Sequence, residues 1–231
     1  MVYFFQTHTQ LLAVLCGLLV GYPFVWVRRE RIGVKNPISV LAVCFAFSIA
    51  SVFSALAFAV IEQYISGVLF PRIGPISVLG VYLICPLLLL LVAKISRLKI
   101  SGFLDCFAIY ASISLIFMRC NCLISGCCLG TLIPGTEMRY PTRQAEIIFY
   151  LLMIFWFMYK ERKGYVKGTF FPFLMMMYGI VRFILEWFRV ADTPSAFHLS
   201  HVWAILAAVI GAVIYFMMIK KSSRNLPKEE A

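Results

Sequence analysis

The stretch PISVLAVCFAFSIASVFSALAFAVI, residues 37–61, contains no charged side chain. About 20 consecutive apolar residues are enough for a helix to cross the hydrocarbon core of a bilayer. A charge-free run of this length is therefore typical of a transmembrane helix. Comparable apolar runs recur along the chain, and together they decide the fold class.

Composition extends this interpretation to the whole chain. Hydrophobic residues make up 62% of the 231 residues and charged residues 13%, whereas soluble domains carry roughly 25% charged residues. No small-residue cleavage site follows the first apolar run, so we interpret that run as a retained span rather than a signal peptide. The sequence thus predicts an all-α integral membrane protein.

Seven transmembrane helices are predicted from the apolar runs. They lie near Leu11–Val27, Pro37–Ile61, Pro75–Ala93, Gly102–Phe117, Glu146–Tyr159, Thr169–Phe188 and Val202–Ile219. No long polar insertion or repeat interrupts them. We therefore expect one membrane domain, residues 1–219, followed by a short basic cytoplasmic tail, residues 220–231.

The basic residues predict the orientation, because Lys and Arg are retained on the cytoplasmic side of a membrane. With the N-terminus outside and the C-terminus in the cytoplasm, most of the 21 Lys and Arg residues fall on the inner side. These inner residues are Arg28, Arg29, Arg31, Lys35, Lys94, Arg97, Lys99, Lys160, Arg162, Lys163, Lys167, Lys220, Lys221, Arg224 and Lys228. A basic face against anionic lipid explains the net charge of +11 without a nucleic-acid partner.

Further arginines gather on the predicted outer side, together with fewer carboxylates. The arginines are Arg119, Arg139, Arg143, Arg182 and Arg189, and the carboxylates are Glu137, Glu146, Glu186 and Asp192. Arg182 and Glu186 are four residues apart, which places both on one face of a helix. A structural ion pair is one interpretation of this pair. The excess of guanidinium groups favours a site for an anion such as a lipid phosphate.

Four cysteines lie in MRCNCLISGCCLG, residues 118–130: Cys120, Cys122, Cys127 and Cys128. Their spacing, C-x-C-x4-C-C, matches neither the paired C-x2-C of a zinc ribbon nor the C-x-x-C of a dithiol oxidoreductase. We therefore predict no metal site and no cofactor. On an oxidising outer face these thiols are expected to form one or two disulfides that brace the turn.

Three motifs resemble those of the prolipoprotein diacylglyceryl transferase family. The run YGIVRFILEWFRVAD, residues 178–192, is similar to its sixth-helix signature, in which Tyr-Gly, Arg-Phe, Glu-Phe-Phe-Arg and a following Asp recur at this spacing. MRCNCLISGCCLG resembles its arginine signature, and RYPTRQAE, residues 139–146, resembles a third motif. The positions in register are Arg119, Gly126, Gly130, Arg139, Pro141 and Glu146.

The resemblance implies an enzyme of the bacterial cytoplasmic membrane with phosphatidylglycerol, or another anionic phospholipid, as donor. It implies transfer of the diacylglyceryl group to the thiol of a lipoprotein-precursor cysteine at the outer face. The implied catalytic residues are Arg119 and Arg182, which would hold the departing phosphate, and Glu186, which would orient Arg182 or move a proton. The implied substrate-binding residues are Arg143, Glu146, Tyr178, Arg189, Cys127 and Gly126.

The chain also departs from the family pattern. The family's arginine signature has Asn, Asn and Glu where this chain has Cys122, Ser125 and Cys127, and no histidine stands near residues 75–77, where the family has His-Gly-Gly. Two alternatives to the transferase therefore stay open. One is a catalytically silent lipid-binding accessory protein, and the other is a membrane thiol redox or metal-transfer protein that uses Cys127 and Cys128.

Overall fold

The computed structural model describes residues 2–70, 76–189 and 198–224. Within these ranges the chain forms helices and no β-strand, which confirms the predicted all-α fold. The helices are α1 (Val2–Val27), α2 (Arg29–Ile32), α3 (Pro37–Ile65), α4 (Leu79–Leu83), α5 (Cys85–Ile95), α6 (Ile100–Ser125), α7 (Thr142–Lys163), α8 (Phe170–Glu186) and α9 (Leu199–Arg224).

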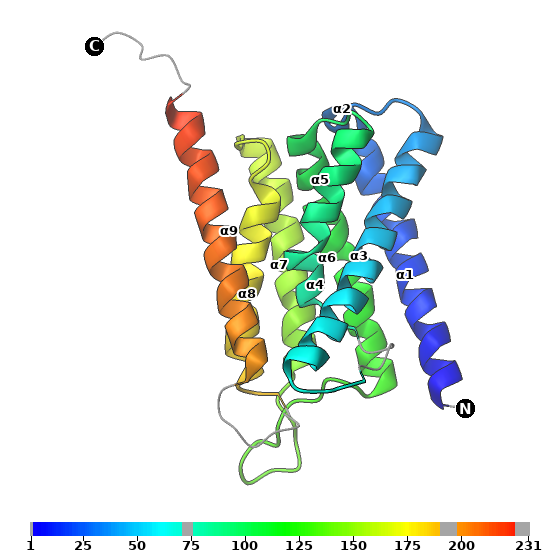
Figure 1. Cartoon of the computed structure of the whole chain (residues 1–231), viewed down its shortest axis with the longest axis vertical. Coiled ribbons are helices and arrows are strands. Elements are labelled where there is room, and N and C mark those ends of the chain that lie inside the picture. The colour runs from blue at the N-terminus through cyan, green and yellow to red at the C-terminus, as the bar shows by residue number, and fades with distance from the viewer. Residues whose placement is uncertain (1, 71–75, 190–197, 225–231) are drawn as a thin grey trace.

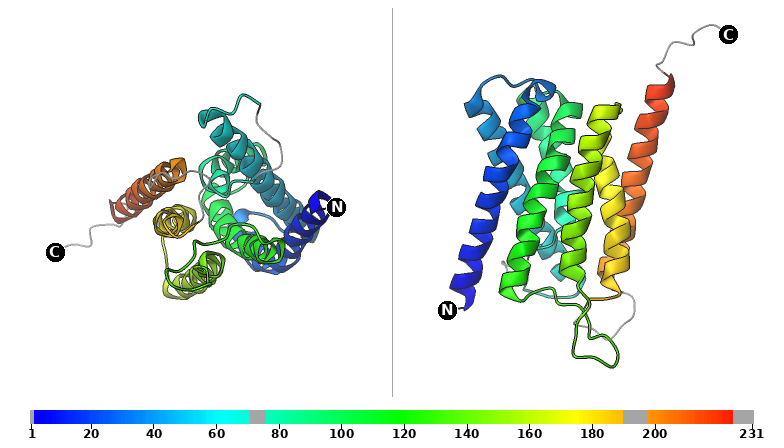
Figure 2. Two further views of the ribbon diagram at one scale, coloured as in Figure 1. Left: turned by 90° about the horizontal axis from the view of Figure 1, so that it is seen from below. Right: turned by 180° about the vertical axis from the view of Figure 1, so that it is seen from behind.

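The long helices stand side by side as one bundle (Figure 1). We call the end at which α6 and α8 finish the loop end, and the other the α2 end; α1 begins at the loop end and α9 finishes at the α2 end. The view from below in Figure 2 shows α6 with α1 and α3 on one side and α7, α8 and α9 on the other. In the apolar stretch of α6, 67% of the residues are buried, compared with 17% in α9. The bundle is therefore built around α6.

Four of the helices in the described ranges are long and apolar enough to cross a membrane: α1 from Thr9 onward, α3, α6 and α9. The apolar helix α5 is shorter, and α7 and α8 lie alongside the long helices (Figure 1). The structure thus supports a membrane protein by helix length and composition. The number of seven spans and their orientation stay predictions.

Two helices extend beyond the predicted ends of their spans. The predicted fourth span ends at Phe117, but α6 continues to Ser125 because no Gly or Pro interrupts it between Gly102 and Gly126. Arg119 therefore lies within the helix and not after it. The predicted tail begins at Lys220, but α9 continues to Arg224, so the tail begins as helix and residues 225–231 lie outside the described residues.

The predicted third span is divided into two helices, α4 and α5. Pro86 stands in the first turn of α5, and its ring nitrogen cannot donate the hydrogen bond that would continue the helix from α4. The amide of Ile84 still donates to Gly80 O (2.9 Å), whereas the amide of Leu87 donates to Ile84 O (3.0 Å), only three residues back. The start of the predicted span, Pro75, lies outside the described residues.

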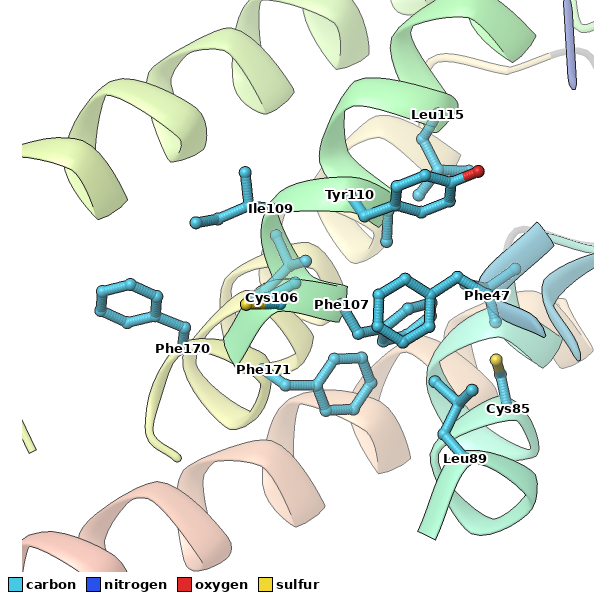
Figure 3. Close-up of a cluster of buried hydrophobic side chains, with 14 of the residues drawn as sticks. Phe47, Cys85, Leu89, Cys106, Phe107, Ile109, Tyr110, Leu115, Phe170 and Phe171 are labelled. Carbon is cyan, nitrogen blue, oxygen red and sulfur yellow. The ribbon is translucent and has the colours of Figure 1, made fainter. Parts of the chain in front are cut away.

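Aromatic side chains fill the core between α3, α6 and α8 (Figure 3). The ring of Phe47 on α3 lies 4.8 Å from Phe103, 5.2 Å from Phe107 and 5.4 Å from Tyr110, all on α6. Phe107 in turn contacts Phe171 of α8 at 5.4 Å. Packed rings of this kind bury large apolar areas and fix the rotation of each helix about its axis.

Close approach of α8 and α9 depends on a glycine in each helix. A Cβ atom on Gly179 would lie 2.5 Å from the backbone nitrogen of Ala208, and one on Gly211 would lie 2.5 Å from that of Met176. Small residues let membrane helices bring their backbones together in this way. The part of α8 that carries Tyr178 is thereby held in a fixed position against α9.

Candidate functional site

At the loop end, the turn after α6 is joined to the chain after α8. Helix α6 ends at Gly126, whose φ of 68° is the left-handed conformation that a glycine adopts freely. Four residues later the backbone of Gly130 pairs with Arg189 in an antiparallel bridge, and the amide of Thr131 donates to Phe188 O (2.8 Å). Two segments that are far apart in the sequence, and that both carry arginines, are thus brought together.

Five charged side chains form an alternating series across this region. Arg119 of α6 pairs with Glu146 of α7, and Arg182 of α8 lies 3.4 Å from the other oxygen of Glu146. Arg182 also pairs with Glu186 at 2.9 Å, and Arg189 lies 3.7 Å from the same Glu186 oxygen. Within this series three guanidinium groups therefore share two carboxylates.

These charges are withdrawn from the surface. Arg119 is 5% exposed and Glu146 2%, and the side chains of Arg182, Glu186 and Arg189 retain 11–14% of their exposure. Burying an ion is costly unless it is paired. The carboxylates therefore hold the arginines in place, and the guanidinium groups lie in a region with little water to screen their charge.

The three arginines open onto a single cavity of about 380 Å³ between α3, α6, α8 and the start of α9. Its charged lining residues are Arg119, Arg182, Arg189 and one carboxylate, Glu62. Sequence analysis placed the arginines on one side of the membrane, and the structure brings these three into one pocket. A pocket with three arginines and one glutamate in its wall is suited to an anion.

Tyr178 also lines the cavity and is 1% exposed. Its ring stacks on Tyr82 of α4, with centroids 4.1 Å apart, and Tyr150 of α7 lies 6.3 Å away. The Tyr178 hydroxyl is buried and has no hydrogen-bond partner in the part of the chain that the structure describes. Because a buried hydroxyl without a partner costs free energy, this group is available to a ligand.

Two of the predicted outer arginines donate hydrogen bonds to backbone carbonyls and do not line the cavity. Arg143 Nη1 donates to Cys122 O (2.9 Å) and to Cys127 O (3.3 Å), and Arg139 Nη1 donates to Gly130 O (3.0 Å). Neither lines the cavity. The structure therefore places Arg143, predicted as a substrate-binding residue, where it ties the turn to α7. Gly126 likewise shapes the turn, and among the described residues nothing beyond its chain neighbours lies within 4 Å of the place its Cβ would take.

The cysteines do not form the predicted disulfides, since all eight are free thiols. The sulfur atoms of Cys122, Cys127 and Cys128 lie within 4.8 Å of one another, and Arg119 Nη1 lies 4.0 Å from two of them, those of Cys122 and Cys128. Hydrogen bonds from the thiols of Cys122 and Cys127, aided by the Arg119 guanidinium, hold the pKa of Cys128 well below its ordinary value. Cys128 also lines the cavity.

Sequence analysis missed Glu62 as a member of the site. It stands one residue beyond the charge-free run, on the last turns of α3, and interacts electrostatically with Arg182 and by hydrogen bond with Ser77. The signal was the pair Glu62 and Gln63 at the end of a predicted span. Polar residues at a span end are common at any membrane surface, so this signal alone did not indicate a site.

Fold and site together define a helical membrane protein with an arginine-lined cavity at one end of its bundle. The sequence profile of the prolipoprotein diacylglyceryl transferase family matches residues 2–217, and the chain belongs to this family. Two proteins named phosphatidylglycerol–prolipoprotein diacylglyceryl transferase, from the Florida and St. Maries strains of Anaplasma marginale, are each 28% identical to the chain over 187 residues. The match covers 72% of this chain and 65% of each relative.

Proposed function

We propose that this protein transfers the diacylglyceryl group of phosphatidylglycerol to the thiol of a prolipoprotein cysteine, the reaction for which the Anaplasma relatives are named. One observation carries the proposal: Arg119, Arg182 and Arg189 line one cavity with Tyr178, whose hydroxyl has no hydrogen-bond partner among the described residues. The family indicates the class of reaction, and the arginines of the cavity could bind the phosphate of the phospholipid donor.

Charge explains why arginines suit this reaction. A phosphodiester carries one negative charge, and the glycerol phosphate that leaves carries a second after its bond to the diacylglyceryl carbon breaks. Guanidinium groups placed against the phosphate therefore interact more strongly as the bond breaks, and so they lower the barrier. In this proposal Arg119 and Arg182 hold the phosphate, Arg189 adds to the field, and Glu146 and Glu186 fix the planes of the guanidinium groups.

A second cavity offers a place for acyl chains. It has a volume of about 310 Å³, lies between α1, α3 and α6, and shares Ile76 and Val78 with the arginine cavity. Its other lining residues include Leu11, Val14 and Leu115. An apolar cavity that adjoins a cationic one matches the two chemical parts of a phospholipid, a hydrocarbon tail and a phosphate head.

The distribution of basic residues gives the proposed placement in the membrane. We place the loop end at the outer face of the bacterial cytoplasmic membrane and the basic α2 end in the cytoplasm. Seven spans result if α4 with α5, α7 and α8 cross together with the four long apolar helices. The N-terminus is then outside and the tail after Ile219 is cytoplasmic.

The test is release of water-soluble glycerol phosphate from phosphatidylglycerol by the purified protein, with and without a peptide that carries a lipoprotein-type cysteine. We expect release that requires the peptide and is lost when the cysteine of the peptide is replaced by serine. No release with any thiol peptide, while phospholipid still co-purifies with the protein, would contradict a transferase and support a lipid-binding protein.

Two variants tie the activity to the cavity. Arg182→Ala should lower turnover by about 10²- to 10³-fold, because it removes a guanidinium that interacts most strongly with the developing charge. Arg162→Ala, an exposed arginine at the α2 end, should leave turnover unchanged. Equal effects of both changes would mean that the cavity is not where the phosphate is held.

A further inference from the structure

Three thiols converge at the edge of the arginine cavity. Cys122 lies on the last turn of α6, and the left-handed turn at Gly126 carries Cys127 and Cys128 back toward it. Cys128 itself has a φ of 56°, a conformation that non-glycine residues rarely adopt. Arg143 secures the turn by its hydrogen bonds to Cys122 O and Cys127 O. The arrangement is thus fixed by the backbone and a buttressing side chain.

The separation of the three sulfurs suits a metal ion. They lie within 4.8 Å of one another, and a tetrahedral zinc ion with Zn–S bonds of about 2.3 Å would hold them about 3.8 Å apart. The side chains therefore need only a small rotation to close on the ion. The linear spacing of the cysteines gave no indication of a metal site, because it does not describe the turn that brings the sulfurs together.

Arg119 lies where its positive charge can offset the negative charge of such a site. Three thiolates around a divalent ion carry one negative charge in excess, and Arg119 Nη1 lies 4.0 Å from the sulfurs of both Cys122 and Cys128. Donors to the ligand sulfurs offset their charge and orient them. The same guanidinium pairs with Glu146 and lines the cavity, so it joins the thiol cluster to the phosphate pocket.

We propose that Cys122, Cys127 and Cys128 bind a zinc ion that takes the acceptor thiol as its fourth ligand. Zinc with three protein ligands keeps one open position, and a thiol that coordinates zinc loses its proton. Because Cys128 lines the arginine cavity, the acceptor sulfur would lie beside the bound phosphodiester. This role rests on the proposed transferase function.

The chemistry balances without a redox partner. The acceptor thiol releases its proton to solvent as it binds the ion. Its sulfur then forms a bond to the glyceryl carbon, the bond from that carbon to the phosphate oxygen breaks, and the electron pair remains on the phosphate. The thioether product has little affinity for zinc, so it leaves the open position for the next acceptor.

Metal binding is tested apart from activity on the reduced, full-length protein in detergent after treatment with a chelator. Co²⁺ titration should give one equivalent of sulfur-to-cobalt charge-transfer absorption, displaced by Zn²⁺. Cys122→Ser, Cys127→Ser and Cys128→Ser should each weaken binding at least tenfold, while Cys120→Ser, a neighbour outside the cluster, should bind as the wild type does. No stoichiometric binding, or equal binding by all four variants, would overturn the proposal.

Activity then tests the role of the ion. Zinc-loaded protein should release glycerol phosphate at least tenfold faster than chelated protein, and Cys120→Ser should behave as wild type. Equal rates with and without zinc, together with a loss of activity in Glu62→Gln, would assign proton removal to the carboxylate and overturn the metal role. Zinc binding without release by any peptide would overturn the proposed function and this role, but not the metal site.

Discussion

The described part of the bundle contains two clusters of charged side chains, one at each end, and they differ in whether their arginines line a cavity. At the α2 end, Glu161 of α7 accepts from Arg28 Nε at 2.7 Å and also pairs with Arg31. Arg28 Nη1 donates to Phe24 O (2.8 Å), and Arg31 Nη1 lies 3.2 Å from the Tyr165 hydroxyl. At the loop end, three arginines share two carboxylates and all three line a cavity.

The cavity makes the loop-end cluster the candidate site. The guanidinium of Arg28 meets a carboxylate and a carbonyl in good geometry, so an added anion would have to displace an existing partner. At the loop end, an anion in the cavity would meet three guanidinium groups in its wall and could accept from the Tyr178 hydroxyl, which has no partner among the described residues. Buried charge alone therefore does not identify a candidate site, whereas charge that lines a cavity does.

The largest expected effect is on stability at the α2 end. Arg28→Ala leaves Glu161 buried and without its bidentate partner, and truncating one member of a buried pair costs about 3–5 kcal/mol. Thermal unfolding in detergent should show the loss, whereas turnover per folded molecule should match the wild type. A fall in turnover with unchanged stability would mean that this cluster also takes part in the reaction.

Sequence reasoning identified most of the loop-end site but not how its members are connected. The motifs indicated Arg119, Arg182, Glu186 and Glu146, because charge is rare enough in a membrane span to attract notice. That Glu146 lies between Arg119 and Arg182 depends on the rotation of three helices, which the aromatic core fixes. No linear pattern records that rotation.

The turn after α6 was less predictable still. The predicted outer location suggested disulfides, but the positions of Cys127 and Cys128 follow from two left-handed residues, Gly126 and Cys128, with one residue between them. Arg143 was predicted to bind substrate, and in the structure it donates to two backbone carbonyls of this turn. Side chains that bind backbone and side chains that bind substrate have the same residue type, so only geometry distinguishes them.

An intermediate effect is expected when the guanidinium of Arg119 is replaced by an ammonium group that keeps the positive charge. Arg119→Lys cannot pair with Glu146 and reach the sulfurs of Cys122 and Cys128 together, because an ammonium lacks the planar set of donors. Turnover should fall about 10- to 100-fold, or about 1.4 to 2.7 kcal/mol. An undiminished rate would show that charge alone suffices. The matched change Arg31→Lys at the α2 end should leave the rate unaltered.

The smallest effect contrasts one tyrosine from each cluster. The Tyr178 hydroxyl has no partner among the described residues, so Tyr178→Phe should leave the free energy of unfolding within about 0.5 kcal/mol of wild type. If that hydroxyl donates to the bound phosphate, turnover or substrate affinity should fall at least about tenfold, since a hydrogen bond to a charged group contributes about 1.5 kcal/mol or more. Tyr165→Phe, which removes the contact to Arg31, should lower stability by about 1 kcal/mol and leave kinetics unchanged. The comparison between the clusters fails if Tyr165→Phe affects kinetics and Tyr178→Phe does not, because the free hydroxyl would then have no ligand to bind.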